Sequence, residues 1–317
     1  MAAPGIIKDG VQVIDKAYVR LRVLAEATWH GARQRYFAIY DRVRTFFTDL
    51  DTETRPERDS RKSSRRRKPT DTPARRTKRE ARVPDDTRVY AIGDVHGRAD
   101  LLKRLLDLIH ADIEAAEEKR IVVIFLGDYV DRGFQSKEVI DHLLSEELSR
   151  YETYFLKGNH EAAFETFLSD ASFGPQWARF GGAETLMSYG IQPPRAKTVA
   201  SEWEAVCEQL NRQMPVEHRS FLSTLSLYAT LGDYVFVHAG LRPGVALDQQ
   251  TERDLLWIRE EFLRDENVFD RVVIHGHTPI STPHHDFRRI GIDTGAYLTG
   301  KLTAACLVGT EVSFLST

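Results

Sequence analysis

Five short turns carry most of the polar side chains in this sequence that could do chemistry. Each follows an apolar run and combines Gly with Asp, Asn or His, and together they span residues 93–97, 127–133, 158–161, 237–240 and 275–279. They offer carboxylate, amide and imidazole groups but no thiolate, the ligand mixture that hard or borderline divalent cations prefer. One Gly-Asp turn would be weak support for a site, because the dipeptide is common in turns. Five such turns in one chain favour a metal centre.

The order of these turns resembles the calcineurin-like metallophosphoesterases, and within them the bacterial and phage branch of the phosphoprotein phosphatase family. The motifs that carry the resemblance read Gly-Asp-x-His-Gly, Gly-Asp-x-Val-Asp-Arg-Gly, Gly-Asn-His-Glu, His-Ala-Gly and Gly-His-Thr. They cover about residues 89–317 and leave about the first 85 residues unmatched. The resemblance implies an α/β protein, a four-layer α/β/β/α sandwich with a binuclear metal centre.

The resemblance implies six metal ligands and two divalent cations. Asp94 and His96 would bind one cation, Asn159, His238 and His277 would bind the other, and Asp128 would bridge both. A bridging carboxylate can hold two cations about 3.5–4 Å apart, and the two cations acidify a shared water so that hydroxide exists near neutral pH. Manganese suits a site of oxygen and imidazole ligands, with iron and zinc as alternatives.

Four further residues are expected to perform the reaction. The resemblance implies that His160 is the general acid and that Asp131 orients it and keeps it protonated, because a carboxylate partner raises the pKa of a histidine. Arg132 would bind the phosphoryl oxygens with its planar guanidinium group. Arg259 would be a second phosphoryl clamp, since Trp257-Ile258-Arg259 resembles the Trp-x-Arg of bacterial members. The alternative for Arg259 is a surface arginine on a helix.

Two residues beside the motifs have weaker claims. Many metallophosphoesterases end in Gly-His-x-His and use both histidines, whereas Pro279 stands at the later position here, so His277 is the expected ligand. His275 then becomes a supporting or merely structural group. Arg242 follows the His-Ala-Gly motif and is interpreted as a loop arginine.

The function that the resemblance implies is metal-dependent hydrolysis of phosphate monoesters through attack by a metal-bridging hydroxide. A serine/threonine protein phosphatase is the first interpretation, with a phosphoprotein or a small phosphoester as the substrate. The second is a symmetrical dinucleoside polyphosphate hydrolase, like the diadenosine tetraphosphatases, which usually carry Gln where this chain has His96. A third is an inactive scaffold. Residues 292–296 stand where eukaryotic members have Ser-Ala-Pro-Asn-Tyr-Cys, which argues against regulatory subunits of the eukaryotic kind.

The elements that must position these turns alternate between short apolar strands and helices, as in an α/β sheet. Helices are expected at residues 99–118 and 136–149, and a helical insertion at about 175–225. Late strands at 291–292, 302–308 and 312–315 predict a second sheet packed on the first. Strands of the first sheet are expected at 89–92, 121–126, 153–156, 234–237 and 272–274.

The chain divides into three parts. Residues 88–317 form the predicted catalytic domain. Residues 52–87 form a basic linker without enough apolar side chains to fold, with 13 Lys/Arg against 4 Asp/Glu between Arg55 and Arg82. Residues 1–51 have apolar side chains at steps of three or four from Ile7 to Leu50, which predicts an amphipathic helical arm that mediates oligomerisation or docks on a membrane surface.

Composition excludes several classes of protein. The chain has 317 residues, a net charge near −3 and two cysteines, which is too few for a disulfide framework. It has no apolar run of about 18 residues and no secretory leader, so a cytoplasmic protein is expected, with the arm as a route to the membrane surface. The basic linker lacks interleaved aromatic residues, and no specific nucleic-acid partner is expected.

Overall fold

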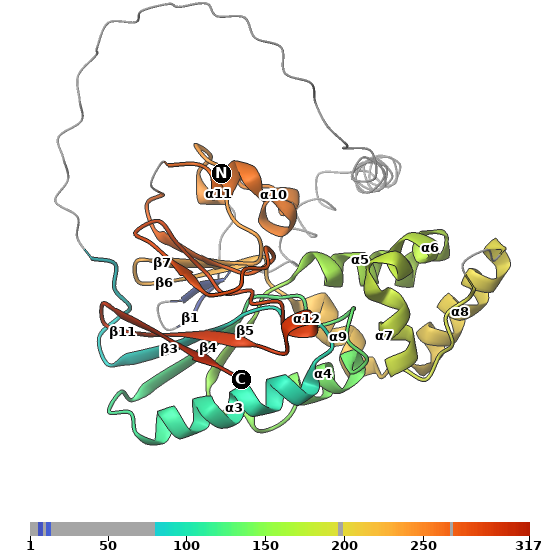
Figure 1. Ribbon diagram of the computed structural model, residues 1–317, viewed down its shortest axis with the longest axis horizontal. Coiled ribbons are helices and arrows are strands. Elements are labelled where there is room, and N and C mark those ends of the chain that lie inside the picture. The colour runs from blue at the N-terminus through green and yellow to red at the C-terminus, as the bar shows by residue number, and fades with distance from the viewer. Residues whose placement is uncertain (1–5, 9–10, 14–79, 196–198, 267–268) are drawn as a thin grey trace, which may run out of the picture. The chain divides into compact units, whose positions relative to one another are not determined.

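Two β-sheets face each other, and helices cover their outer faces (Figure 1). In this computed structural model, the described part of the chain comprises residues 6–8, 11–13, 80–195, 199–266 and 269–317. Helices α3 and α4 lie on the outside of one sheet, and α10 and α11 lie on the outside of the other. The arrangement confirms the predicted α/β/β/α sandwich.

The first sheet holds three parallel strands in its interior and at one edge. Its order is β12-β11-β3-β4-β5, with β3, β4 and β5 parallel and β11 antiparallel to both β3 and β12. The carboxyl ends of parallel strands meet at one edge of a sheet, so the turns after β3, β4 and β5 are neighbours. The strands are β3 (Thr87–Ile92), β4 (Arg120–Phe125), β5 (Glu152–Phe155), β11 (Thr303–Val308) and β12 (Glu311–Ser316).

The second sheet positions the two remaining turns. Its order is β1-β2-β6-β7-β8-β10-β9, and β7 runs parallel to β8, so their carboxyl ends also meet. The strands are β1 (Ile6–Lys8), β2 (Val11–Val13), β6 (Tyr228–Leu231), β7 (Tyr234–Val237), β8 (Val272–His275), β9 (His284–His285) and β10 (Arg289–Gly291).

The late strands do not form a sheet of their own. Strand β11 pairs with β3 from Ala304↔Ile92 to Val308↔Arg88, and β12 follows β11, so both extend the first sheet. Strands β7 and β8, expected in the first sheet, belong to the second with β10. The prediction of this grouping is therefore wrong, because a short apolar strand is compatible with either sheet and only long-range pairing selects one.

Helices surround the sheets and form the insertion. The helix expected at 99–118 is present as α3 (Ala99–Glu114). The helix expected at 136–149 ends early, as α4 (Ser136–Leu143), and is followed by the short turn η1 (Leu148–Arg150). The other helices are α5 (Asn159–Ser169), η2 (Ala171–Phe173), α6 (Gly174–Trp177), the π-helical turn η3 (Ala178–Gly182), α7 (Ala183–Ser188), α8 (Ala200–Gln213), α9 (Val216–Thr224), η4 (Leu247–Gln249), α10 (Glu252–Trp257), α11 (Glu260–Leu263) and α12 (Ala296–Thr299).

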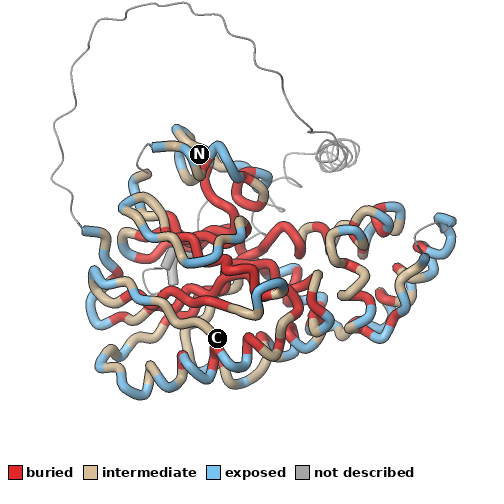
Figure 2. Tube along the Cα trace, viewed as in Figure 1, coloured by how far each residue is buried: buried red, intermediate tan, exposed pale blue. Residues whose placement is uncertain are grey.

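The core lies between the two sheets. Figure 2 shows the buried chain concentrated there and the exposed chain on the outer helices and loops. Removing these apolar side chains from water is the main term that stabilises the sandwich, at roughly 25 cal/mol per Å². The inter-sheet core includes Val89, Ala91, Val122, Ile124, Ala305 and Leu307 from the first sheet, and Ala229, Leu231, Phe236, Ile274 and Ile290 from the second.

The beginning of the chain differs from the prediction. Strands β1 and β2 pair antiparallel, and β2 continues the second sheet by pairing with β6 through Gln12↔Thr230 and Val13↔Ala229. The predicted helix is therefore wrong for residues 6–8 and 11–13, because the edge of β6 offers backbone N–H and C=O groups that a strand can pair with. The rest of the predicted arm and most of the linker, residues 14–79, lie outside the described residues.

The folded catalytic unit also begins slightly before the predicted boundary at residue 88. Val83 is fully buried, and its backbone N–H donates to Gly309 O at 3.0 Å. Over the described residues, no helix is long and apolar enough to cross a membrane.

Candidate active site

The five predicted turns meet where β3, β4, β5, β7 and β8 end, and backbone hydrogen bonds link them in pairs. The N–H of Val95 donates to Asp128 O at 3.1 Å, and the N–H of Gly276 donates to His238 O at 2.8 Å. The N–H of His277 reaches across the sheets to the carboxylate of Asp94, at 3.2 and 3.0 Å from its two oxygens. Residues far apart in the sequence therefore form one polar cluster.

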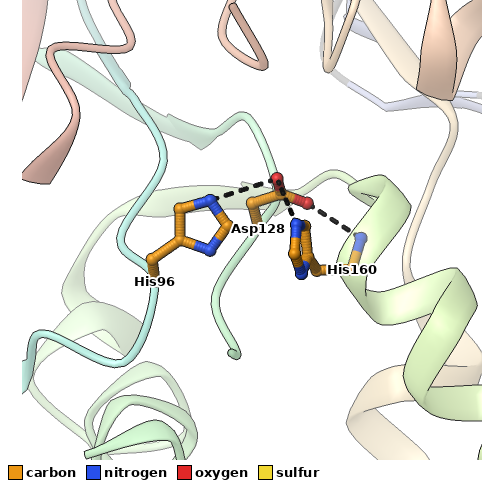
Figure 3. Close-up of side chains that lie close together, drawn as sticks. All are labelled: His96, Asp128 and His160. Carbon is orange, nitrogen blue, oxygen red and sulfur yellow. Dashed lines mark hydrogen bonds and ion pairs between the residues drawn. The ribbon is translucent and has the colours of Figure 1, made fainter. Parts of the chain in front are cut away.

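Asp128 lies at the centre of this cluster. Its carboxylate is 3.4 Å from His96 Nε2 and 3.5 Å from His238 Nε2, on different oxygens. The backbone N–H of His160, in the first turn of α5, donates to Asp128 Oδ1 at 3.0 Å (Figure 3). Burial raises the pKa of Asp128, but the surrounding histidines outweigh burial and hold the pKa well below its ordinary value. Asp128 is therefore an ionised carboxylate that faces ligands on two sides.

Backbone carbonyls set the orientation of two of the imidazoles. His96 Nδ1 lies 3.0 Å from Val130 O, and His238 Nδ1 lies 2.9 Å from Leu126 O. A carbonyl only accepts, so Nδ1 carries the proton in both rings and the Nε2 lone pair faces Asp128. Burial lowers the pKa of both histidines, which favours the neutral form that binds metals.

Three groups converge on the other side of Asp128. His238 Nε2 lies 2.9 Å from Asn159 Oδ1 and 3.2 Å from His277 Nδ1. His277 Nε2 is buried without a hydrogen-bond partner. Burial, and then the neighbouring His238, lowers the pKa of His277 well below its usual value. Neutral imidazoles packed against each other and an amide oxygen suit a cation between them.

The donor set fits two divalent cations. One group that could hold a cation is His96, Asp128 and His160, and another is Asp128, His238 and His277, each with ligand atoms within 4.8 Å of one another. Both groups contain Asp128, as a bridging ligand requires. His160, the expected general acid, stands in the first group in the place expected for Asp94.

Asp94 lies beside these groups as a buried carboxylate. Burial, and then the charges of Asp293 and Asp128, raises its pKa well above the ordinary value. Burial also raises the pKa of Asp293 to about 6. Three buried carboxylates in one cluster repel each other, and divalent cations would neutralise them.

His160 and Asp131 form a buried pair. His160 Nδ1 lies 2.8 Å from Asp131 Oδ2, which leaves Nε2 facing Asp128 Oδ2 at 4.0 Å and Arg132 Nη2 at 3.2 Å. Burial lowers the pKa of His160, but Asp128 and the hydrogen bond with Asp131 outweigh it, so the pKa is raised. The Arg132 guanidinium can only donate, so it faces the Nε2 lone pair of neutral His160, and Nε2 can take up a proton once Arg132 turns to another acceptor.

Arg132 is held by its backbone and by an aromatic ring. Its N–H donates to Gly181 O at 3.1 Å, and its guanidinium carbon lies 4.7 Å from the centre of the Tyr297 ring. The Tyr297 ring also packs edge-on against His96, with centroids 5.4 Å apart. The guanidinium group therefore stays next to His160 Nε2, where it could bind the oxygens of a phosphoryl group.

The sequence profile described as Calcineurin-like phosphoesterase matches residues 87–305. This chain belongs to the calcineurin-like phosphoesterase family. The match spans all five turns of the site, and both sheets and their connections agree with a phosphoesterase core of this family.

Relatives of this phosphoesterase include proteins named asymmetrical bis(5'-nucleosyl)-tetraphosphatase PrpE. The one from Anoxybacillus flavithermus is 25% identical over 67% of this chain and 87% of the relative, and the one from Bacillus subtilis is 26% identical with the same coverage. Among solved structures, a serine/threonine phosphatase from Saccharomyces cerevisiae superposes with a TM-score of 0.42 and 15% identity, covering 73% of this chain and 79% of that one.

The remaining predicted residues of the phosphoesterase occupy different surroundings. Arg259, just before α11, is exposed, and its Nη1 lies 3.5 Å from Thr278 Oγ1; its charge also interacts with Asp128 and Asp94. It therefore faces the cluster from its rim. Arg242 instead binds Asp254 at 2.6 Å, as expected of a loop arginine. His275 Nδ1 lies 3.0 Å from Gly276 O, and neither cation-binding group contains it.

Several residues that support the phosphoesterase site lie outside the recognised motifs, so the sequence analysis did not predict them. Trp177 Nε1 donates to Asp131 Oδ2 at 3.0 Å, and Thr185 Oγ1 donates to Asp131 Oδ1 at 2.7 Å. Both come from the helical insertion, about fifty residues from Asp131, so spacing carried no signal for them. Between them they complete the hydrogen bonding of the carboxylate that orients His160.

Glu161 is a further supporting residue, and its motif was recognised without a role for its side chain. The fully buried carboxylate accepts N–H bonds from Asp128 at 2.8 Å, Tyr129 at 2.7 Å and Gly158 at 2.9 Å. It thereby ties the turn after β4 to the turn after β5. Together with the N–H bond from His160 to Asp128 Oδ1, this carboxylate sets the position of Asp128 relative to Asn159 and His160.

Proposed function

We propose that this chain is a metal-dependent hydrolase of phosphate esters and anhydrides that acts on dinucleoside polyphosphates. One observation carries the hydrolase assignment: His160 Nε2 lies 3.2 Å from Arg132 Nη2 and 4.0 Å from Asp128 Oδ2, while Asp131 holds Nδ1. A proton donor, a phosphoryl-binding guanidinium and a bridging carboxylate thus lie within one small volume, as phosphoryl transfer to water requires.

Each group of the chain has a separate task in this proposal. Two divalent cations, when bound, supply positive charge that acidifies a water molecule and neutralises phosphoryl oxygens. Arg132 binds and orients the phosphoryl group, and Arg259 adds a second positive charge from the rim. His160 holds a proton at Nε2 for the departing oxygen, and Asp131 stabilises the resulting imidazole tautomer.

The names of the curated relatives support dinucleoside polyphosphates as the substrate class. Relatives that share about a quarter of their residues with this chain over most of their own length are named asymmetrical tetraphosphatases. The symmetrical class was the second interpretation of the sequence, behind a serine/threonine protein phosphatase. Asymmetrical cleavage of a tetraphosphate yields a nucleoside triphosphate and a monophosphate, whereas symmetrical cleavage yields two diphosphates, so product analysis separates the two.

A serine/threonine protein phosphatase is the second candidate. The combination of His96, the Gly-Asn-His-Glu motif and the Gly-His-Thr ending favours it, because it resembles the phosphoprotein phosphatase branch. The reacting group would be the same in either case. The candidates differ in what the phosphoryl group is attached to.

Hydrolysis of three substrates by the full chain tests the proposal. Diadenosine tetraphosphate, a phosphoserine peptide and p-nitrophenyl phosphate are compared with manganese, iron, zinc or chelator present, and products are resolved by anion exchange. We expect hydrolysis of diadenosine tetraphosphate to triphosphate and monophosphate, with manganese the best activator. Faster turnover of the phosphopeptide would favour the second candidate, and full activity under chelation would contradict a metal-dependent reaction.

A further inference from the structure

A pocket of about 410 Å³ lies beside the proposed phosphoryl clamp. Arg132 forms one part of its wall and Tyr297 of α12 another. The rest comes from the helical insertion and includes Arg179, Phe180 and Glu184. Because Arg132 belongs both to the clamp and to the wall, the pocket adjoins the place where a bound phosphoryl group would lie. A group attached to that phosphoryl could extend into it, and we call it the leaving-group pocket.

Glu184 contributes a carboxylate oxygen that lacks a partner. Its Oε2 is buried and accepts no hydrogen bond. A buried acceptor without a donor costs free energy, and such atoms in folded proteins usually have a partner. Glu184 precedes Thr185, whose hydroxyl is anchored on Asp131 at 2.7 Å, so the start of α7 is fixed in place. Glu184 as a whole is only partly buried and lines the pocket, so its carboxylate can turn this oxygen toward a donor that a ligand would supply.

The wall between Glu184 and the clamp is formed by a tight turn. Gly181 has φ 106° within the π-helical turn η3, and a Cβ there would lie 2.4 Å from Arg132 N. Only glycine permits this approach, in which Gly181 O accepts the N–H of Arg132 at 3.1 Å. Helical irregularities of this kind occur often at functional sites. The turn places Arg179 and Phe180 on the pocket at a defined position beside Arg132.

The chemistry of the lining is a pair of guanidinium groups, aromatic rings and one carboxylate. Arg132 and Arg179 favour an anion with more than one phosphate. Phe180 and Tyr297 offer apolar rings, and Glu184 accepts from hydroxyl or N–H donors. The volume lies within the range of about 300–1,000 Å³ that small-molecule pockets have.

We propose that the leaving-group pocket binds one nucleotide of a dinucleoside polyphosphate, with Glu184 accepting the ribose hydroxyls, Arg179 binding a second phosphate and Phe180 packing on the base. This inference rests on the proposed function. Two adjacent ribose hydroxyls match a carboxylate, as in dinucleotide-binding folds. A phosphoserine peptide carries neither a second phosphate on the same linker nor a paired diol, so it matches the lining less well.

The test compares substrates with and without the ribose hydroxyls. Wild-type protein and Glu184→Ala are assayed with manganese on diadenosine tetraphosphate, on its 2',3'-dideoxy analogue and on p-nitrophenyl phosphate. We expect Glu184→Ala to lower kcat/KM for diadenosine tetraphosphate about 10–100-fold, the range for losing a hydrogen bond to a charged group. In that variant the ribose and dideoxy substrates should react alike, whereas the wild-type protein should prefer the ribose substrate by a similar factor.

Matched variants separate binding from folding. Glu184→Gln keeps the size of the side chain and one acceptor oxygen, so it should lose less kcat/KM than Glu184→Ala. Arg179→Gln should raise KM for diadenosine tetraphosphate and make this KM less dependent on salt. Glu204→Gln replaces an exposed residue on α8 and should leave kcat/KM unchanged for all three substrates. Melting temperatures of all the variants check that they are folded.

The outcomes distinguish this inference from the proposed function. An unchanged preference for ribose in Glu184→Ala, or an equal loss on p-nitrophenyl phosphate, overturns the inference and leaves the proposed function standing. Hydrolysis of p-nitrophenyl phosphate and phosphopeptide without hydrolysis of diadenosine tetraphosphate overturns the substrate class together with the pocket's role. No hydrolysis of any substrate with any of the metals overturns both proposals.

Discussion

At the residue scale, the site concentrates unusual backbone conformations. Among the described residues that are not glycine, positive φ angles occur at His96 (46°), Asp128 (52°), Asp131 (72°), Arg132 (68°) and His277 (63°), and outside the site only at Asp86 (55°). Such conformations cost free energy, of order 1–3 kcal/mol each, and persist where the surrounding structure determines them. Here the turns need them to aim Asp128 and its neighbours at one point.

Asp128→Asn should abolish hydrolysis and lower the bound metal content, because the bridging position loses its negative charge. Asparagine adopts left-handed backbone conformations readily, so the substitution tests the charge and leaves the turn intact. Metal analysis by mass spectrometry and an assay on p-nitrophenyl phosphate measure the two effects. Asp107→Asn on the exposed face of α3 is the control. Retained activity with full metal content would remove Asp128 from the bridging role.

His160→Ala should lower kcat by about 10²–10⁴-fold on alkyl phosphates, the usual contribution of a positioned general acid. Alanine suits the first turn of α5, so the helix should remain. The loss should be smaller on p-nitrophenyl phosphate, since p-nitrophenolate departs without protonation. A comparison of the two leaving groups measures this, with His142→Ala as the control. Equal losses on both would mean that His160 acts in another way, for example as a metal ligand.

At the element scale, the helical insertion completes the acid pair. Trp177 at the end of α6 donates to Asp131, and its ring stacks against Phe164 and Phe167, with centroids 5.2 and 4.6 Å away. Thr185 in α7 binds the other oxygen of Asp131. The insertion therefore positions His160 indirectly, through the carboxylate that the imidazole faces.

Trp177→Phe should keep the aromatic packing and remove the N–H that binds Asp131 Oδ2. We expect a loss in kcat of about tenfold on alkyl phosphates, comparable to one hydrogen bond, with KM little changed. If Trp177 acts through His160, the double variant Trp177→Phe/His160→Ala should be no slower than His160→Ala alone. Additive losses would instead show that Trp177 affects the reaction by another route.

At the scale of the whole molecule, the first strands of the chain lie at one edge of the second sheet and contribute no residue to the two cation-binding groups. Strand β2 pairs with β6, whereas the proposed ligands His238 and His277 follow β7 and β8 further along the second sheet. Removing β1 and β2 leaves β6 as an exposed edge and removes backbone hydrogen bonds from it. We therefore expect the removal of β1 and β2 to lower the stability of the protein and to have little effect on catalysis.

Deleting residues 1–79 should therefore lower the melting temperature by a few degrees and leave kcat/KM for p-nitrophenyl phosphate within about threefold. The deletion keeps Val83, which fills the core. Thermal unfolding and steady-state kinetics measure the two quantities. A shorter deletion of residues 1–13 should cause the same loss of stability. A folded but inactive truncation would show that the removed segment belongs to the catalytic unit.

The same pair of deletions tests the proposed role of the remaining arm in assembly or docking. The protein that lacks residues 1–13 should keep its apparent mass on a sizing column, or its binding to anionic vesicles at low salt, because the apolar and basic residues from 14 to 79 are retained. The protein that lacks residues 1–79 should lose that property. Identical behaviour of both truncations and the full chain in both assays would contradict this role.

The sequence by itself identified the ligand types and the turns that carry them, and its resemblance to a known family implied the four-layer sandwich. The ligand types and the turns depend on local patterns, since an apolar strand followed by a Gly-containing turn places Asp, Asn or His at a strand end whatever lies further along the chain. Asp94, Asp128, Asn159 and His160 could be recognised for this reason. The parallel pairing of β3, β4 and β5 then brings those ends together.

The tertiary structure alone decided which distant residues complete the site and which strands share a sheet. Trp177, Thr185 and Tyr297 reach Asp131 and Arg132 only because the insertion and α12 pack against the turns. Strand β11 joins β3, and β2 joins β6, through pairings between residues about two hundred positions apart. Such contacts depend on how complete surfaces fit together in space, and the spacing of residues along the chain does not predict them.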